Sequence, residues 1–303
     1  MISHIDYLTT QDRCRIRYGI YPCRLGAVHG TILLLSGRSE FMEKYSETIQ
    51  DLNRRGFHVY SFDWRGQGLS SRGLKDRHKG YVGSYQEYIG DLDQFVTRVV
   101  SPDAAGPLIC LSHSMGGHIL LRYLHDHPGI ISKAVLVSPM VDIYTPPVPK
   151  LLTIWLTRLA RQLRQTHSYA PGEGCYQPPD SKRFKTNILT TDLKRYLVTG
   201  SAVDGNADLA LGGVTFGWLA ATFESLEILA RPDYLSAVDT PCLMVTAGAD
   251  RVVPPAAQKK TCQTLPDCRF KLIPDAYHEI LMESNRYRDQ FWKAFDAFTG
   301  KNT

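Results

Sequence analysis

The sequence predicts an α/β fold in which a mostly parallel sheet is covered by helices on both faces. Strand-length apolar runs alternate with segments of helical periodicity along most of the 303 residues, and this alternation is typical of parallel sheets. The alternation stops between residues 139 and 232, where prolines and glycines interrupt the pattern. We therefore expect one core of residues 1–138 and 233–303, with a helical cap of residues 139–232 inserted into it.

Six apolar runs are the expected parallel strands, and they follow an opening hairpin that turns around Thr10–Asp12. The runs are residues 31–35, 57–62, 108–111, 133–138, 242–246 and 269–273. The expected helices between and after them are residues 41–55, 85–100, 116–127, 256–264 and 285–299.

The composition indicates an ordinary globular protein and excludes several other classes. No apolar stretch approaches the roughly 18 residues of a transmembrane helix, and the polar N-terminal residues do not form a secretory signal. The seven cysteines are scattered without a Cys-x-x-Cys pair, which indicates neither a disulfide framework nor a zinc site and favours a reducing cytoplasm. The net charge of +5 allows an anionic partner, but no basic module indicates nucleic acid.

The segment Pro107–His118 joins an apolar run to a helical pattern through Ser-His-Ser-Met-Gly-Gly. This is the form of a nucleophile elbow, a sharp strand-to-helix turn that exposes the hydroxyl of a serine, here Ser114. The turn requires small residues two before and two after the nucleophile, and Ser112 and Gly116 occupy these positions. The motif alone is equally compatible with a serine that caps a helix. Whether Ser114 is a nucleophile therefore depends on whether the sequence also supplies a base and an acid for it.

A serine nucleophile needs a base and an acid that orients the base. A turn after the run 242–246 presents Asp250, and a loop after the run 269–273 presents His278. Both lie just beyond the carboxyl ends of strands, where open α/β sheets place their sites. Asp275 is the nearest alternative acid.

A tetrahedral intermediate also needs backbone N–H donors for its oxyanion. One is expected from Met115, directly after the nucleophile. The other is expected from the loop Ser36–Ser39, where Gly37 permits a turn and the amide of Arg38 is the candidate donor.

Together these segments resemble the bacterial lysophospholipase and monoacylglycerol-lipase-like family of α/β-hydrolases, over nearly the whole chain. The segments that carry the likeness are Gly37–Tyr45, Asp63–Ser70, Ser112–Gly117, Asn187–Thr190, Leu211–Trp218 and Ala276–Leu281. The resemblance implies a serine hydrolase with Ser114 as nucleophile, Asp250 as acid and His278 as base. It also implies that the substrate is a monoacyl lipid, a lysophospholipid or monoacylglycerol, which loses its fatty acid through an acyl-enzyme. Two departures are Ser36 in place of the His of many lipases and Ser112 in place of the first Gly of the elbow.

In this family the inserted cap walls the acyl pocket, and the sequence of residues 149–164 suits that role. An apolar stripe at helical spacing includes Trp155, Leu156 and Leu159, which we predict to bind the substrate. Residues 150–195 carry nine Lys or Arg and three acids. The helix therefore suits either peripheral contact with an anionic membrane surface or packing on the core with its charges in water. Cap cations, with the Arg38 side chain, are candidates for holding a lipid head group.

Two other functions remain open on the sequence. A general esterase or peptidase of the same fold would act on a small ester, lactone or amide, although the acid-poor cap argues against binding a free amine. A non-catalytic binding protein would not need the Ser, Asp and His described above. Nothing indicates a metal or cofactor, since Gly66-Gln-Gly68 lacks the Lys-Ser/Thr of a phosphate loop.

Overall fold

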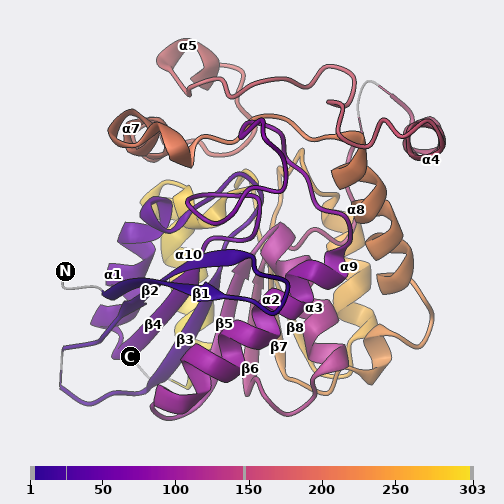
Figure 1. Cartoon of the computed structure of the whole chain (residues 1–303). Coiled ribbons are helices and arrows are strands. Elements are labelled where there is room, and N and C mark those ends of the chain that lie inside the picture. Colours follow the sequence, from indigo (N-terminus) through magenta and orange to yellow (C-terminus); the bar gives the residue numbers. More distant parts are fainter. Residues whose placement is uncertain (1–3, 25, 146–147, 301–303) are drawn as a thin grey trace.

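The computed structural model describes residues 4–24, 26–145 and 148–300, and its centre is an eight-stranded sheet in the order β1-β2-β4-β3-β5-β6-β7-β8 (Figure 1). The pairs β1–β2 and β2–β4 are antiparallel, and the other neighbours are parallel. The strands are β1 (His4–Thr9), β2 (Arg15–Tyr21), β3 (Gly30–Leu35), β4 (Phe57–Phe62), β5 (Leu108–His113), β6 (Lys133–Val137), β7 (Cys242–Ala247) and β8 (Cys268–Ile273). The predicted mostly parallel sheet with an opening hairpin is thus confirmed.

Helices cover both faces of this sheet, as the alternating pattern predicts. They are α1 (Ser46–Arg54), α2 (Tyr85–Phe95), α3 (Met115–Asp126), α8 (Phe216–Leu229), α9 (Pro255–Thr264) and α10 (Asn285–Thr299). The segment expected as a helix over 41–55 begins with a separate 3₁₀ turn, Met42–Tyr45, and the helix expected over 85–100 continues beyond α2 as a π-helical turn.

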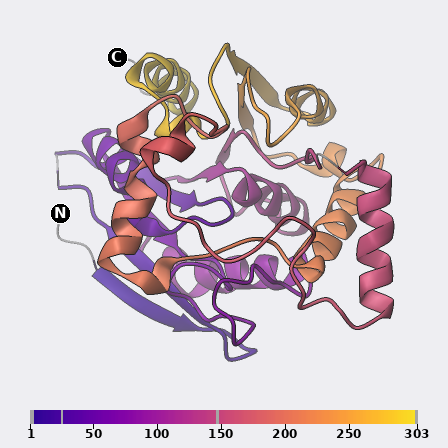
Figure 2. The same ribbon diagram turned by 90° about the horizontal axis from the view of Figure 1, so that it is seen from above.

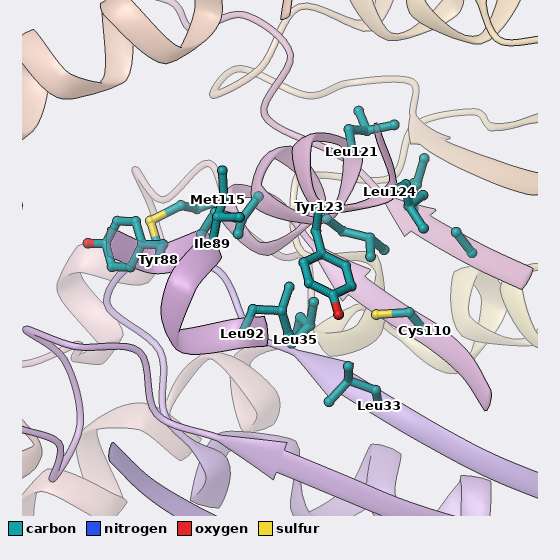
Figure 3. Packing of buried hydrophobic residues seen from close by; sticks show 14 of the residues in the cluster. Leu33, Leu35, Tyr88, Ile89, Leu92, Cys110, Met115, Leu121, Tyr123 and Leu124 are labelled. Atoms are coloured by element: carbon teal, nitrogen blue, oxygen red, sulfur yellow. The ribbon is translucent and has the colours of Figure 1, made fainter. Parts of the chain in front are cut away.

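Successive residues of β3 show why its apolar run is continuous. Leu33 and Leu35 belong to the cluster that packs against α2 and α3 (Figure 3), whereas Ile32 and Leu34 belong to the cluster on the opposite face, with α1 and α10. Because neighbouring side chains on a strand point to opposite faces, a strand that is covered on both carries consecutive apolar residues, as Ile32–Leu35 do here.

Four short or amphipathic helices lie above the sheet (Figure 1). These cap helices are α4 (Lys150–Gln162), α5 (Ser181–Phe184), α6 (Leu193–Tyr196) and α7 (Val198–Gly205). The views in Figures 1 and 2 show α4 on one side and the other short helices on the opposite side. Helix α8 also falls within the segment 139–232 that we expected to form the cap, yet its Trp218, Ala221 and Leu229 belong to the same core cluster as α2 and α3. The last helix of the insertion therefore covers the sheet and connects β6 to β7.

A disulfide joins Cys262 near the end of α9 to Cys268 at the start of β8. The expectation that the cysteines form no disulfide is therefore wrong for this pair. The reason is that the chain reverses between the helix and the strand, which brings the two Cα atoms to 5.4 Å although six positions separate them. The prediction of a reducing compartment rested on the cysteine pattern, and this disulfide removes that support. Within the described ranges, no helix has the length and apolarity needed to cross a membrane.

Candidate active site

Ser114 lies at a sharp turn between β5 and α3, with φ 49° and ψ −115°. A non-glycine residue in this conformation is strained, and the neighbouring chain fits closely around it. A Cβ at Gly116 would lie 2.5 Å from the carbonyl oxygen of Ser36 and 2.8 Å from that of Leu35. Only glycine therefore lets the loop after β3 come so close to the elbow. Ser112 is accommodated at the other small position because its hydroxyl donates to the carbonyl of Val135 at 3.2 Å.

The structure brings the three predicted catalytic side chains into one hydrogen-bonded row, and all three are buried. His278 Nε2 lies 2.9 Å from Ser114 Oγ, and His278 Nδ1 lies 2.7 Å from Asp250 Oδ2. The alternative acid, Asp275, is an exposed turn residue with φ 60°.

The second oxygen of Asp250 is held by the backbone. Oδ1 accepts hydrogen bonds from the amides of Val252 at 2.8 Å and Val253 at 2.9 Å. The carboxylate is thereby fixed with Oδ2 toward His278 Nδ1, which donates to it and leaves Nε2 free to accept the proton of Ser114. In this arrangement His278 can act as a general base for the serine hydroxyl.

The loop Ser36–Ser39 crosses in front of the elbow, and two of its amides are already bonded within the protein. Gly37 donates to Glu40 Oε2, and Ser39 donates to Gln67 Oε1. In the described part of the chain, no acceptor is bonded to the amide of Arg38, and Met115, as the first residue of α3, has no intrahelical acceptor for its own. These are the two amides that the sequence predicts as donors to the oxyanion.

The side chain of Arg38, a candidate for holding a head group, lines the cavity above Ser114 but is also bonded within the protein. Its Nη2 donates to the carbonyl of Gly212 at 2.6 Å, and its guanidinium carbon lies 5.4 Å from the ring centre of Trp218. Burial lowers the pKa of this guanidinium. The side chain thus ties the loop after β3 to the chain that enters α8.

A cavity of about 800 Å³ opens above Ser114 and His278. Leu156 lines it, together with apolar residues of the segments on either side, including Ile143, Leu211 and Leu219. Of the three cap residues predicted to bind substrate, the structure places only Leu156 in this wall.

Trp155 and Leu159 do not line the cavity, because α4 packs on α8 through a different face than we expected. The buried residues of α4 are Thr157 and Ala160, whose small side chains allow the two helices to approach closely (Figures 1 and 2). Part of the apolar stripe consequently faces outward, with Trp155 56% exposed, whereas Leu156 faces the cavity. Periodicity therefore identifies the stripe correctly, but of the three residues predicted to bind substrate it places only Leu156 on the correct side.

Sequence reasoning did not single out a group of buried charges next to the triad, formed by Glu40, Lys44, His113 and Glu279. The available signal was the spacing of Glu40 and Lys44, an acid followed four residues later by a base. Across the residues that the structure describes, no set of three or more His, Cys, Asp or Glu side chains is placed to hold a metal ion.

Comparison with known proteins shows which enzymes the chain resembles. The chain is 29% identical over 294 residues to the probable lysophospholipase L2 of Haemophilus influenzae, covering 97% of this chain and 91% of that protein. It is 31% identical over 268 residues to lysophospholipase L2 of Escherichia coli, covering 85% and 76%. A soluble variant of the monoglyceride lipase of Saccharomyces cerevisiae, solved with a substrate analog, superposes with a TM-score of 0.79 at 21% identity, covering 100% of this chain and 97% of that one.

The fold and these relatives define a carboxylic ester hydrolase of the α/β-hydrolase class. More narrowly, the chain belongs to the family described as serine aminopeptidase, S33, whose model matches residues 26–285.

Proposed function

We propose that this enzyme releases the fatty acid from a monoacyl lipid, a lysophospholipid or monoacylglycerol, through an acyl-enzyme on Ser114. The observation that carries the proposal is the Asp250–His278–Ser114 row at the base of a cavity of about 800 Å³. That volume lies within the range of ligand pockets, about 300–1,000 Å³. The names of the lysophospholipase and monoglyceride lipase relatives support the lipid class of the substrate.

The proposed reaction has two steps of the same form. Ser114 Oγ attacks the ester carbonyl carbon while its proton passes to His278 Nε2, and the amides of Arg38 and Met115 donate to the oxyanion. The intermediate expels the alcohol, which takes the proton from His278. Water then attacks the acyl-enzyme with His278 again as base, and the fatty acid leaves.

The charges in the cavity favour an anionic head group over a free amine. Arg183 and Arg251 both line it, and neither forms an ion pair with an acid in the described residues. Three acids also line it: Glu40 and Glu279 are both paired with Lys44, and Glu173 accepts a hydrogen bond from the amide of Val214. On these grounds we propose lysophospholipids ahead of monoacylglycerols as substrates, and both ahead of the aminoacyl substrates that the family description suggests.

We expect fatty-acid release from lysophosphatidylglycerol and lysophosphatidylcholine to exceed that from monoacylglycerol. A panel of these lipids, p-nitrophenyl esters of short and long chain, and proline p-nitroanilide distinguishes the alternatives. Activity restricted to short esters would assign a general esterase, and anilide cleavage a peptidase. No turnover, together with no labelling by a fluorophosphonate, would leave a binding protein on a hydrolase fold.

We also propose that the outer face of α4 contacts the lipid surface from which the substrate comes. Its exposed residues include Leu151 at 82%, Leu163 at 62% and Trp155 at 56%. The positive charge that we expected to contribute is largely neutralised, because Arg158 and Arg161 pair with Glu227 and Glu224 of α8. Apolar insertion into the interface therefore dominates this proposal.

Replacing Leu151 and Trp155 together by serine is expected to weaken binding to anionic vesicles by roughly tenfold for each side chain removed from the interface. Vesicle flotation measures this change, and turnover of a short water-soluble ester should stay constant. The exposed Ile130, on the far end of the molecule from the cavity, gives a matched control as Ile130→Ser. Equal binding of wild type and double variant would contradict the proposed contact.

A further inference from the structure

The carboxylate of Glu40 is buried at the point where the loop after β3 meets the elbow, and it accepts from several donors. Oε2 accepts from the amide of Gly37, from the hydroxyl of Tyr45 at 2.6 Å and from His113 Nδ1 at 3.2 Å. Oε1 accepts from Lys44 Nζ at 2.8 Å. So many donors, one of them a cation, stabilise the ionised form of the carboxyl group.

The ring of His113 lies between this carboxylate and the loop that carries the catalytic base. Its Nε2 lies 3.3 Å from the carbonyl oxygen of His278, and the two imidazole rings are 4.9 Å apart between centres. A carboxylate and a carbonyl can only accept hydrogen bonds. Both ring nitrogens of His113 must therefore donate, and only the imidazolium form has a proton on each.

A second buried histidine, His118 of α3, shows the contrasting arrangement. Its Nδ1 lies 2.9 Å from the carbonyl oxygen of Met140, but its Nε2 lies 2.6 Å from the hydroxyl of Ser225. That hydroxyl accepts from Arg122 Nη1 at 3.0 Å and has its own proton to donate to the ring. His118 is thus satisfied as a neutral imidazole, and burial lowers its pKa to about 3.

We propose that Glu40 and a protonated His113 form a buried ion pair that fixes the oxyanion loop, residues 36–39, relative to the loop of the catalytic base. Both are positioning residues for acyl transfer, since neither touches the reacting atoms. This inference rests on the proposed function, in which Arg38 donates to the oxyanion and His278 is the base. A parallel link supports it, because Lys44 Nζ also lies 2.7 Å from Oε1 of Glu279, the residue after His278.

The charges that face the pair balance one another. His113 is surrounded by Glu40, Lys44, Glu279 and the ring of His278. Burial alone would lower the pKa of His113, but the charge and hydrogen bond of Glu40 outweigh it and raise that pKa. Burial likewise opposes ionisation of Glu40, but Lys44 and His113 hold the pKa of Glu40 well below its usual value. The pair is therefore lost as the pH rises through the raised pKa of His113, or falls through the lowered pKa of Glu40.

The first test needs no substrate and uses the wild-type chain labelled with ¹⁵N-histidine. At about pH 8, above the ordinary histidine pKa of about 6.5, NMR should show both ring nitrogens of His113 protonated and only one of His118. The variants His113→Gln and His118→Asn assign the signals by their loss. A neutral imidazole at His113 would overturn the proposal, whatever the enzyme hydrolyses.

The second test separates positioning from binding. Glu40→Gln and His113→Gln should each lower kcat by about 10²-fold, the typical effect of displacing a site by about 1 Å, with KM unchanged. The double variant should lose little more, since both substitutions break one pair. Glu43→Gln, on the same turn but paired outward with Arg17, should match the wild type. Losses of kcat that multiply in the double variant, or effects that appear in KM alone, would overturn the pairing. If Glu40→Gln fails to fold, the NMR result on the wild-type chain decides.

Discussion

Replacing Ser114 by alanine is expected to reduce turnover of every ester substrate by about 10⁶-fold, as losses of a serine nucleophile do. The hydroxyl lies 2.9 Å from His278 Nε2, and among the described residues no other hydroxyl is hydrogen-bonded to that nitrogen. Without it no covalent intermediate forms, so labelling by a fluorophosphonate should disappear together with turnover.

The control for this variant is Ser132→Ala, which removes an exposed hydroxyl that donates to the carbonyl of Leu108 at the other end of β5. This variant should be labelled and should turn over substrate like the wild type. Substantial turnover by Ser114→Ala, with its folding verified by circular dichroism, would exclude the acyl-enzyme mechanism.

The second large effect is expected for Asp250→Asn, roughly a 10⁴-fold fall in kcat with little change in KM. Because the amides of Val252 and Val253 require an acceptor, the carbonyl oxygen of the new side chain takes the place of Oδ1. Its NH₂ group then faces His278 Nδ1, which must become an acceptor. The ring consequently carries its proton on Nε2 and cannot accept the proton of Ser114.

Asp275→Asn is the matched control, because it makes the same change in the exposed acid next to the same loop. Steady-state kinetics on one long-chain ester compares the two variants. If Asp275→Asn lost activity and Asp250→Asn kept it, the assignment of the acid would be wrong.

The sheet and the hydrogen-bonded set of Ser114, His278 and Asp250 could be predicted because both depend on short-range sequence patterns. A strand covered on both faces, such as β3, carries a run of consecutive apolar residues, and the residues that follow β5, β7 and β8 are brought to one edge by parallel pairing alone. Arg38 could be predicted to lie beside the elbow for the same reason, because it follows β3, which pairs in parallel with β5.

Features that depend on tertiary packing could not be predicted in the same way. Periodicity shows which residues of α4 share a stripe, but the small residues Thr157 and Ala160 decide which side faces α8. The Cys262–Cys268 disulfide depends on a chain reversal, and the ion pair of Glu40 and His113 depends on burying charges that the sequence alone would leave in water.

The order of the strands also has a consequence for the chain during its synthesis. The proposed nucleophile follows β5, whereas its proposed base follows β8, an edge strand and the last of the eight described strands in the sequence. A chain emerging from the ribosome therefore carries Ser114 for 164 residues before His278 is translated. Under the proposed mechanism, ester hydrolysis requires that β8 has already added to the sheet.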